Sequence, residues 1–340
     1  MKSATVSAVN LAVIISASLL PPMAAQELPV ILEVQTENQV IYVDDNPGPA
    51  QVARNQGPVP VNVATTPVNH FTNVTVGDIV AVNGDPVRGV VTGRGYGLGF
   101  NPAPAAGQAI ADVIRAGFWQ VAFEFLTPDG GQIGSIFIMG FQAGAPAPGS
   151  PPGSTIGNLA IVGGTGAFIG AKGTFNQAAV TNPPGQRPAS VAEDPSRRRI
   201  NGGGGRNRVL LQVFPMFRPE VLLGSNGPVV FHSDFSPVTA ASPARAGENL
   251  IVYARGLGPT TPSVNPGDPF PSEPLAIATS PVEVLVNGRS APAINQIGLP
   301  GTTDTYRVDF RVPDDTAAGT ANIKLSAAWV TGAAAPIPVR

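Results

Sequence analysis

Few residues in this chain have the types and the spacing that enzyme chemistry requires. The 340 residues include no cysteine and two histidines, His70 and His232. A serine hydrolase needs a histidine that lies between a nucleophile and a carboxylate. His232, Ser233 and Asp234 are consecutive, but neighbours on a strand point to opposite faces, so they do not form a triad by themselves. We therefore predict a structural role for His232 and no catalytic residue.

In the segment Leu159 to Gly170, a predicted strand at Leu159 to Val162 runs into glycines, which raises the question of nucleotide binding. A phosphate site would need a helix directly after the glycines, so that its first amide groups face the phosphate. Residues 171–185 contain glycine, proline and asparagine instead of a helical pattern, and no Gly-Lys-Ser/Thr sequence follows. We predict a turn at Gly163 to Gly166, and we predict no cofactor.

Two pairs of aspartates could offer oxygen ligands to a calcium ion. They are Asp44 with Asp45 and Asp314 with Asp315. A closed calcium site uses about six to eight oxygen ligands, and neither segment supplies that number. We interpret both pairs as solvated turns and predict no metal site.

The composition argues against nucleic-acid binding and indicates a folded chain. Charged residues make up 12% of the sequence and the formal net charge is −2, which provides no basic footprint for phosphates. Glycine (40) and proline (37) are abundant. Apolar residues nevertheless fall into short alternating runs between them, as in strands joined by turns. The length is sufficient for two ordinary domains.

The N-terminus has the layout of a secretory signal peptide. Lys2 precedes an apolar run from Leu11 to Leu20, and small residues follow up to Ala25. The run is shorter than the roughly 20 apolar residues of a spanning helix, so we predict no transmembrane segment and cleavage near Ala25. Retention as an N-terminal anchor is the alternative, because Met23 is large for a cleavage site. We expect a secreted, periplasmic or cell-surface protein.

Strand patterns dominate the rest of the chain. Trp119 to Phe125 alternates large apolar residues with smaller or polar ones, and Gln132 to Phe141 returns after a turn at Pro128 to Gly131. Asn83-Gly84 and Asn287-Gly288 are typical of two-residue hairpin turns. The predicted parts are a signal peptide at 1–25, an extended lead-in at 26–65, a first β-domain at 66–218 and a second at 219–340.

Part of the first domain resembles a known family. Residues 162–168 read Val-Gly-Gly-Thr-Gly-Ala-Phe, residues 171–173 read Ala-Lys-Gly, and residues 91–96 read Val-Thr-Gly-Arg-Gly-Tyr. With the hairpin at 123–140, these motifs resemble the dirigent and allene oxide cyclase superfamily over residues 66–217. The resemblance implies an eight-stranded antiparallel β-barrel with an internal apolar cavity, and a homotrimer as in many plant members.

The sequence departs from this family at three positions that bear on activity. Ile169 and Lys172 stand where the family commonly has arginine, and Thr174 stands where tyrosine is frequent. Members of the family steer the coupling of phenoxy radicals or cyclise an oxylipin. The resemblance therefore supports the fold more than the activity.

Five residues are candidate ligand-binding groups inside such a barrel: Arg94, Tyr96, Trp119, Glu124 and Lys172. Glu124 and Trp119 lie on opposite faces of one strand, so only one of them points inward. If Glu124 is interior and near Arg94, its pKa is displaced and a ligand-binding or acid/base role follows. If the aromatic residues fill the interior, Glu124 faces solvent. The sequence alone leaves both interpretations open.

The C-terminal region resembles a second known module. Residues 241–248 read Ala-Ser-Pro-Ala-Arg-Ala-Gly-Glu, and residues 256–260 read Gly-Leu-Gly-Pro-Thr. These motifs resemble the Ig-like C-terminal domain of exported acidobacterial proteins, which is related to IPT/TIG domains. The resemblance implies a β-sandwich that serves as an attached module without chemistry.

These observations favour an exported, non-enzymatic binding or structural protein. Its barrel is expected to hold a small apolar or aromatic ligand, and the Ig-like module to mediate attachment or assembly. The alternative is a dirigent-like or allene oxide cyclase-like enzyme. The expected partners are the small ligand and further copies of the chain in a trimer.

Overall fold

The computed structural model describes residues 28–43, 69–99, 118–142, 157–177, 186–190, 193–197 and 202–340. The predicted signal peptide, the acidic pair at 44–45 and most of the lead-in lie outside the described residues. The described chain is almost entirely β-structure, with one short 3-10 helix at Pro195–Arg197, so the all-β prediction is confirmed. Within this part, no helix combines the length and the apolar character that crossing a membrane requires.

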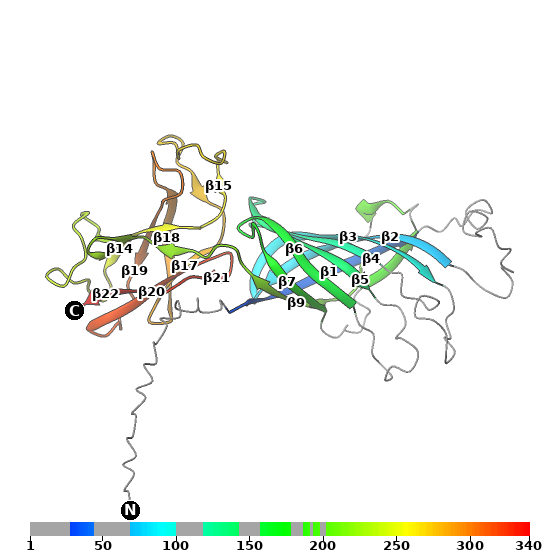
Figure 1. The fold of residues 1–340 in the computed structure, drawn as a ribbon, viewed down its shortest axis with the longest axis horizontal. Helices are drawn as coiled ribbons and strands as arrows, with labels where there is room; N and C mark the ends of the chain where they lie inside the picture. Colours follow the sequence, from blue (N-terminus) through cyan, green and yellow to red (C-terminus); the bar gives the residue numbers. More distant parts are fainter. Residues whose placement is uncertain are drawn as a thin grey trace, which may run out of the picture.

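Eight of the first nine strands form a closed barrel, and the remaining strand pairs with the barrel from outside. Their bounds are β1 (Val30–Val43), β2 (Asn69–Val82), β3 (Asp85–Gly99), β4 (Phe118–Leu126), β5 (Gln132–Gln142), β6 (Gly157–Gly166), β7 (Lys172–Gln177), β8 (Gln186–Ser190) and β9 (Asn207–Phe214). Strands β1 to β7 pair in sequence order, and β9 closes the ring between β7 and β1. β8 pairs in parallel with the end of β1, outside the ring. The predicted eight-stranded antiparallel barrel is thus confirmed (Figure 1).

β1 belongs to the barrel, although the sequence analysis placed it in a lead-in segment. It pairs with β2 along one edge and with β9 along the other. Leu32, Val34 and Thr36 on this strand are fully buried. The barrel therefore begins at Val30. Local patterns could not show this, because β9 is far away in the sequence.

The predicted reversal at Gly163 to Gly166 is wrong. β6 continues through these glycines, and the chain turns at residues 167–170 instead. A Cβ atom on Gly164 would lie 2.2 Å from the carbonyl oxygen of Phe168. The glycine therefore lets the following turn fold back closely against β6, where Phe168 is buried in the barrel core.

The two Asn-Gly hairpins are confirmed. Asn83 and Gly84 join β2 to β3 with φ angles of 52° and 90°. Asn287 and Gly288 reverse the chain in the C-terminal half with φ angles of 51° and 82°. Positive φ at both central residues matches the right-handed twist of the flanking strands, and Asn-Gly adopts it at low cost.

The remaining strands form a second unit, which we call the C-terminal sheet. Their bounds are β10 (Glu220–Val221), β11 (Leu223–Gly224), β12 (Gly227–Pro228), β13 (Val230–His232), β14 (Asn249–Arg255), β15 (Thr260–Thr261), β16 (Ile277–Ala278), β17 (Val282–Val286), β18 (Arg289–Gly298), β19 (Tyr306–Arg311), β20 (Gly319–Ala327), β21 (Val330–Thr331) and β22 (Ala335–Val339). The first half of β18 pairs with β17 and its second half with β19. The register of the β18–β19 pair shifts between Ala293 and Asn295. The sheet therefore curls over its own core.

A tight turn of the C-terminal sheet reaches into the barrel core. Ala328 and Trp329 connect β20 to β21, and Ala328 is fully buried among the barrel residues. The ring centroid of Trp329 lies 6.2 Å from that of Phe125, and its Nε1 donates to Oδ2 of Asp85 at 2.9 Å. Both turn residues have positive φ, 48° and 63°, which is unfavourable for non-glycine residues. Burial in the barrel core offsets this cost.

Further hydrogen bonds cross between the two units. The Thr279 hydroxyl donates to the carbonyl of Gln132 at 2.7 Å. The Arg218 guanidinium donates to the carbonyls of Leu28 and Thr331, at 2.6 and 2.9 Å. The barrel and the C-terminal sheet therefore share a continuous interface, and we expect them to unfold together.

Replacing Trp329 by alanine should destabilise the barrel. We expect Trp329→Ala to lower the free energy of unfolding by roughly 2 kcal/mol, less than for a fully buried tryptophan, since this side chain is only partly buried. Chemical denaturation followed by circular dichroism measures the change. Leu223→Ala, which removes a side chain that is 73% exposed, is the control. If Trp329→Ala and Leu223→Ala were equally stable, the claim that Trp329 stabilises the barrel would be contradicted.

Candidate functional site

One half of the barrel interior is filled by the barrel's own apolar side chains. Phe123, Phe125, Ile136, Ile138 and Leu211 point inward and are at most 2% exposed. A barrel of eight strands is just wide enough for side chains to fill it. The described residues therefore form a packed apolar core at the end that receives Trp329.

A polar layer continues the interior beyond this core. Asn207 donates through Nδ2 to Oε1 of Gln39 at 2.8 Å, and both side chains are buried. Thr36, Asn73 and Thr75 are between 0% and 6% exposed. Within the described part of the chain, the Thr36 and Thr75 hydroxyls and the Asn73 Oδ1 atom have no hydrogen-bond partner. Each such group costs free energy when it is buried without a partner.

Of the five predicted binding residues, Trp119 points into the barrel. It lies opposite Gly95 on β3, where an added Cβ atom would come within 2.8 Å of its ring and 2.7 Å of Oδ1 of Asn73. The ring therefore packs against the polar layer, and Gly95 provides the space. The side chain of Tyr96 is outside the described residues.

The structure places the other three predicted residues on the outer face. Arg94 and Lys172 are exposed, and Glu124 is partly exposed between the buried Phe123 and Phe125. The interior placement that the sequence analysis considered therefore does not hold for them. Period-two alternation explains this, because inward-pointing neighbours force them outward. The structure does not bring Arg94, Glu124 and Lys172 together in one site.

The outer face over β3 to β6 carries a row of apolar side chains. Thr92 lies opposite Ala122, and Ala122 lies opposite Phe137. Opposite residues in antiparallel strands present their side chains on the same face. Val162 is the extra residue of a bulge in β6, beside Phe137, and is 52% exposed. The small side chain of Ala122 leaves a depression between its larger neighbours.

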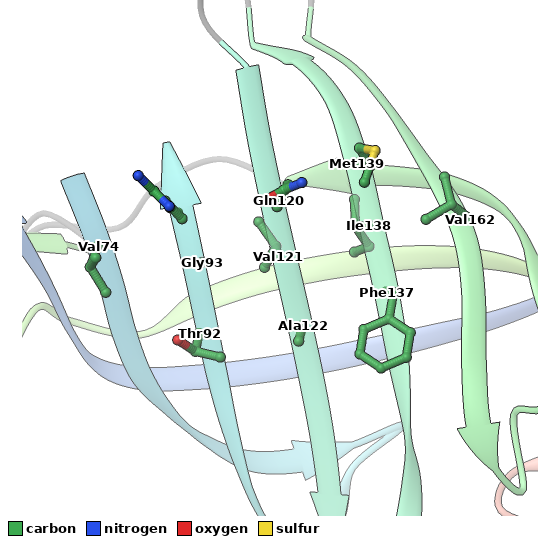
Figure 2. Close-up of a pocket in the computed structure, with 11 residues that line it drawn as sticks. Val74, Thr92, Gly93, Gln120, Val121, Ala122, Phe137, Ile138, Met139 and Val162 are labelled. Atoms are coloured by element: carbon green, nitrogen blue, oxygen red, sulfur yellow. The ribbon is translucent and has the colours of Figure 1, made fainter. Parts of the chain in front are cut away.

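A second row runs beside the first. Val74 lies opposite Arg94, Arg94 opposite Gln120, and Gln120 opposite Met139. Val74 and Met139 are 44% and 37% exposed, so this row also offers apolar surface to solvent. Figure 2 shows the two rows crossing adjacent strands.

The two rows form a shallow groove, which we call the outer groove. It encloses about 390 Å³. The residues that line it are Val74, Thr92, Gly93, Arg94, Gln120, Val121, Ala122, Phe137, Ile138, Met139 and Val162. The volume is within the range of small-molecule sites, about 300 to 1,000 Å³. Apolar side chains exposed together on one face commonly mark a binding surface.

His232 belongs to a cluster in the C-terminal sheet. Its Nδ1 atom lies 2.6 Å from Oε1 of Glu248, and its Nε2 atom lies 3.2 Å from both the carbonyl oxygen and the hydroxyl of Ser242. Nδ1 faces a carboxylate and therefore donates its proton to Glu248, while Nε2 either donates to the Ser242 carbonyl or accepts from the Ser242 hydroxyl, depending on whether Nε2 is protonated. Glu248 also accepts from the backbone N–H of Arg245 at 2.8 Å. These contacts link the end of β13 to the segment that leads to β14, which is consistent with a structural role for His232.

Asp234, which follows His232 in the sequence, points elsewhere. Its carboxylate accepts from the hydroxyl of Ser236 at 2.6 Å and from its backbone N–H at 2.9 Å. These hydrogen bonds, the side-chain bond first, lower the pKa of Asp234 below its usual value. The partner of the histidine is thus Glu248, from the Ala-Gly-Glu motif, which the sequence analysis used only as a family signature.

The second acidic pair is engaged in ion pairs. Asp314 lies 2.7 Å from the guanidinium of Arg311, and Asp315 pairs with Arg289. In the described part of the chain, no group of three or more His, Asp or Glu residues is placed to hold a metal ion.

The sequence analysis missed the outer groove, although a signal for it was present. In β5, residues on both faces are apolar: Ile136 and Ile138 point inward, and Phe137 and Met139 between and beside them point outward. A strand with one solvated face should alternate apolar and polar residues. Its apolar outer face therefore indicates a second contact surface.

Comparison with known proteins gave no match: no family model, curated protein or solved structure is significantly similar to the chain. We therefore infer the function from the geometry of the described residues.

Replacing Thr75 by valine should stabilise the barrel. Valine has nearly the same shape and removes a buried hydroxyl without a protein partner, so we expect a gain of about 1 kcal/mol in the free energy of unfolding. Thr302→Val is the matched control, since its hydroxyl donates to the carbonyl of Leu299 at 2.7 Å and its loss should destabilise. Destabilisation by Thr75→Val would mean that this hydroxyl has a bound partner in solution.

Proposed function

We propose that this protein is an exported, non-enzymatic binding protein that holds a small apolar or aromatic ligand in the outer groove of its barrel. The observation that carries the proposal is the cluster of exposed apolar side chains around Ala122. Phe137, Met139 and Val162 are 39%, 37% and 52% exposed on adjoining strands. Burying such a surface against a ligand is favourable, at about 25 cal/mol per Å² of apolar area.

The packed apolar half of the interior favours the outer groove over that part of the barrel. The apolar half of the interior is filled by residues such as Phe123 and Ile136, which are at most 1% exposed. A ligand there would have to displace well-packed side chains, which costs several kcal/mol. The groove requires no such rearrangement.

The C-terminal sheet supports a role as an attached module. Its curled arrangement over one core agrees with the proposed relation to Ig-like domains, as the closed barrel agrees with the proposed relation to dirigent proteins. The Ala328–Trp329 turn ties it to the barrel. We propose that it positions the barrel on a surface or in an assembly after export.

A bulky residue at the floor of the groove should prevent ligand binding. Ala122→Phe fills the depression between Thr92 and Phe137 without touching the interior. We expect it to weaken the binding of N-phenylnaphthylamine, a neutral aromatic fluorescent probe, at least fivefold. A fluorescence titration of the mature protein measures this.

Ile294→Ser is the matched control, because it removes an apolar side chain that is 62% exposed on the C-terminal sheet. It should leave the affinity for the probe unchanged. Equal binding by wild type and Ala122→Phe would contradict the proposal. So would native mass spectrometry showing that Ala122→Phe dissociates an oligomer, since a second copy of the chain would then occupy the groove.

A further inference from the structure

We infer that the outer groove selects ligands that carry a carboxylate, with Arg94 binding the carboxylate and the apolar side chains of β5 and β6 binding the ligand body. This inference rests on the proposed function, and it adds the chemical class of the ligand. It depends on the charge, the neighbours and the register position of Arg94.

Arg94 carries a positive charge that no described residue compensates. Its outward-facing neighbours with described side chains include Val74 and Gln120 on the adjoining strands and Thr92 on its own strand, and none of these is charged. No ion pair to Arg94 occurs within the described part of the chain. An acidic ligand group can therefore bind here without breaking an existing salt bridge.

The hydrogen-bonding groups at this end of the groove suit a carboxylate. A guanidinium presents parallel N–H donors that match the two oxygens of a carboxylate. Gln120 lies directly opposite Arg94 and also lines the groove, so its amide can donate a further hydrogen bond. One arginine supplies one positive charge, which matches a singly charged ligand.

The register places the apolar surface beside this charged end. From β3, which carries Arg94, to β6, which carries Val162, there are three strand spacings, or about 14 Å. Ala122 and Gln120 on β4, and Phe137 and Met139 on β5, lie between them. A medium-length acyl body can cover this distance, and a bicyclic aromatic body covers the part of it between Arg94 and the apolar side chains of β5.

Glu124 disfavours the reverse orientation of such a ligand. It is the next outward-facing residue after Ala122 on β4, opposite Ser135 on β5. Its negative charge lies beyond the apolar row, away from Arg94, so it repels a carboxylate from that end. Arg88, diagonally beside Glu124, donates to the carbonyl of Pro128 and does not line the groove, so within the described residues the positive charge that lines the groove is that of Arg94.

Isothermal titration calorimetry with naphthoate and naphthamide tests the inference. The two compounds have nearly the same shape, and only naphthoate is charged. We expect wild-type protein to bind naphthoate about fivefold more tightly, as for one partly exposed charge-assisted contact. Raising the salt concentration should reduce this preference.

Arg94→Gln should remove the preference and leave the affinity for naphthamide unchanged. Arg88→Gln is the matched control, because it removes the same charge from an exposed position on the same strand. Arg88 donates to the carbonyl of Pro128 and does not line the groove. This variant should keep the preference for naphthoate.

Equal affinities for naphthoate and naphthamide in wild type would overturn the inference and leave the proposed function standing. An equal loss of both ligands in Arg94→Gln would also overturn it, because Arg94 would then act through packing. Failure of both compounds and of N-phenylnaphthylamine to bind wild type would overturn the proposed function together with the inference.

Discussion

In a closed antiparallel barrel, every second side chain points inward, and eight strands enclose only enough space for those side chains. This constraint assigns each residue of β1 to β7 and β9 to one of two environments. Phe123 and Phe125 fill the interior, so Glu124 between them must face outward. The same alternation turns Arg94 and Lys172 outward. The packed apolar half of the interior leaves no room for a ligand, whereas the outer face offers the groove over β3 to β6.

The C-terminal sheet completes the barrel core. Ala328 is fully buried among barrel residues, and Trp329 contacts Phe125 and Asp85. The turn keeps two non-glycine residues at positive φ, a strain that persists only where surrounding packing compensates it. The two units therefore depend on each other for stability, and the sheet is positioned to hold the barrel in one orientation.

The sequence predicted what local patterns determine. The Asn83–Gly84 turn and the all-β character followed from turn chemistry and period-two alternation. It did not predict that β1 closes the barrel, because its partner β9 lies far away along the chain. The turn after β6 was misplaced because Gly164 serves close packing against Phe168 and not reversal. Among the candidate site residues, Arg94 lines the groove, but its surroundings arise from the register of four strands, which the sequence does not show.

Methyl NMR of the protein with bound naphthoate distinguishes directly between a ligand in the outer groove and a ligand inside the barrel. The methyl groups of Ala122, Met139 and Val162 face the groove, whereas those of Ile136 and Leu211 are buried in the interior. We predict nuclear Overhauser contacts from naphthoate to the first set of methyl groups and none to the second. Contacts to Ile136 or Leu211 would show that the ligand enters the barrel and would contradict the account.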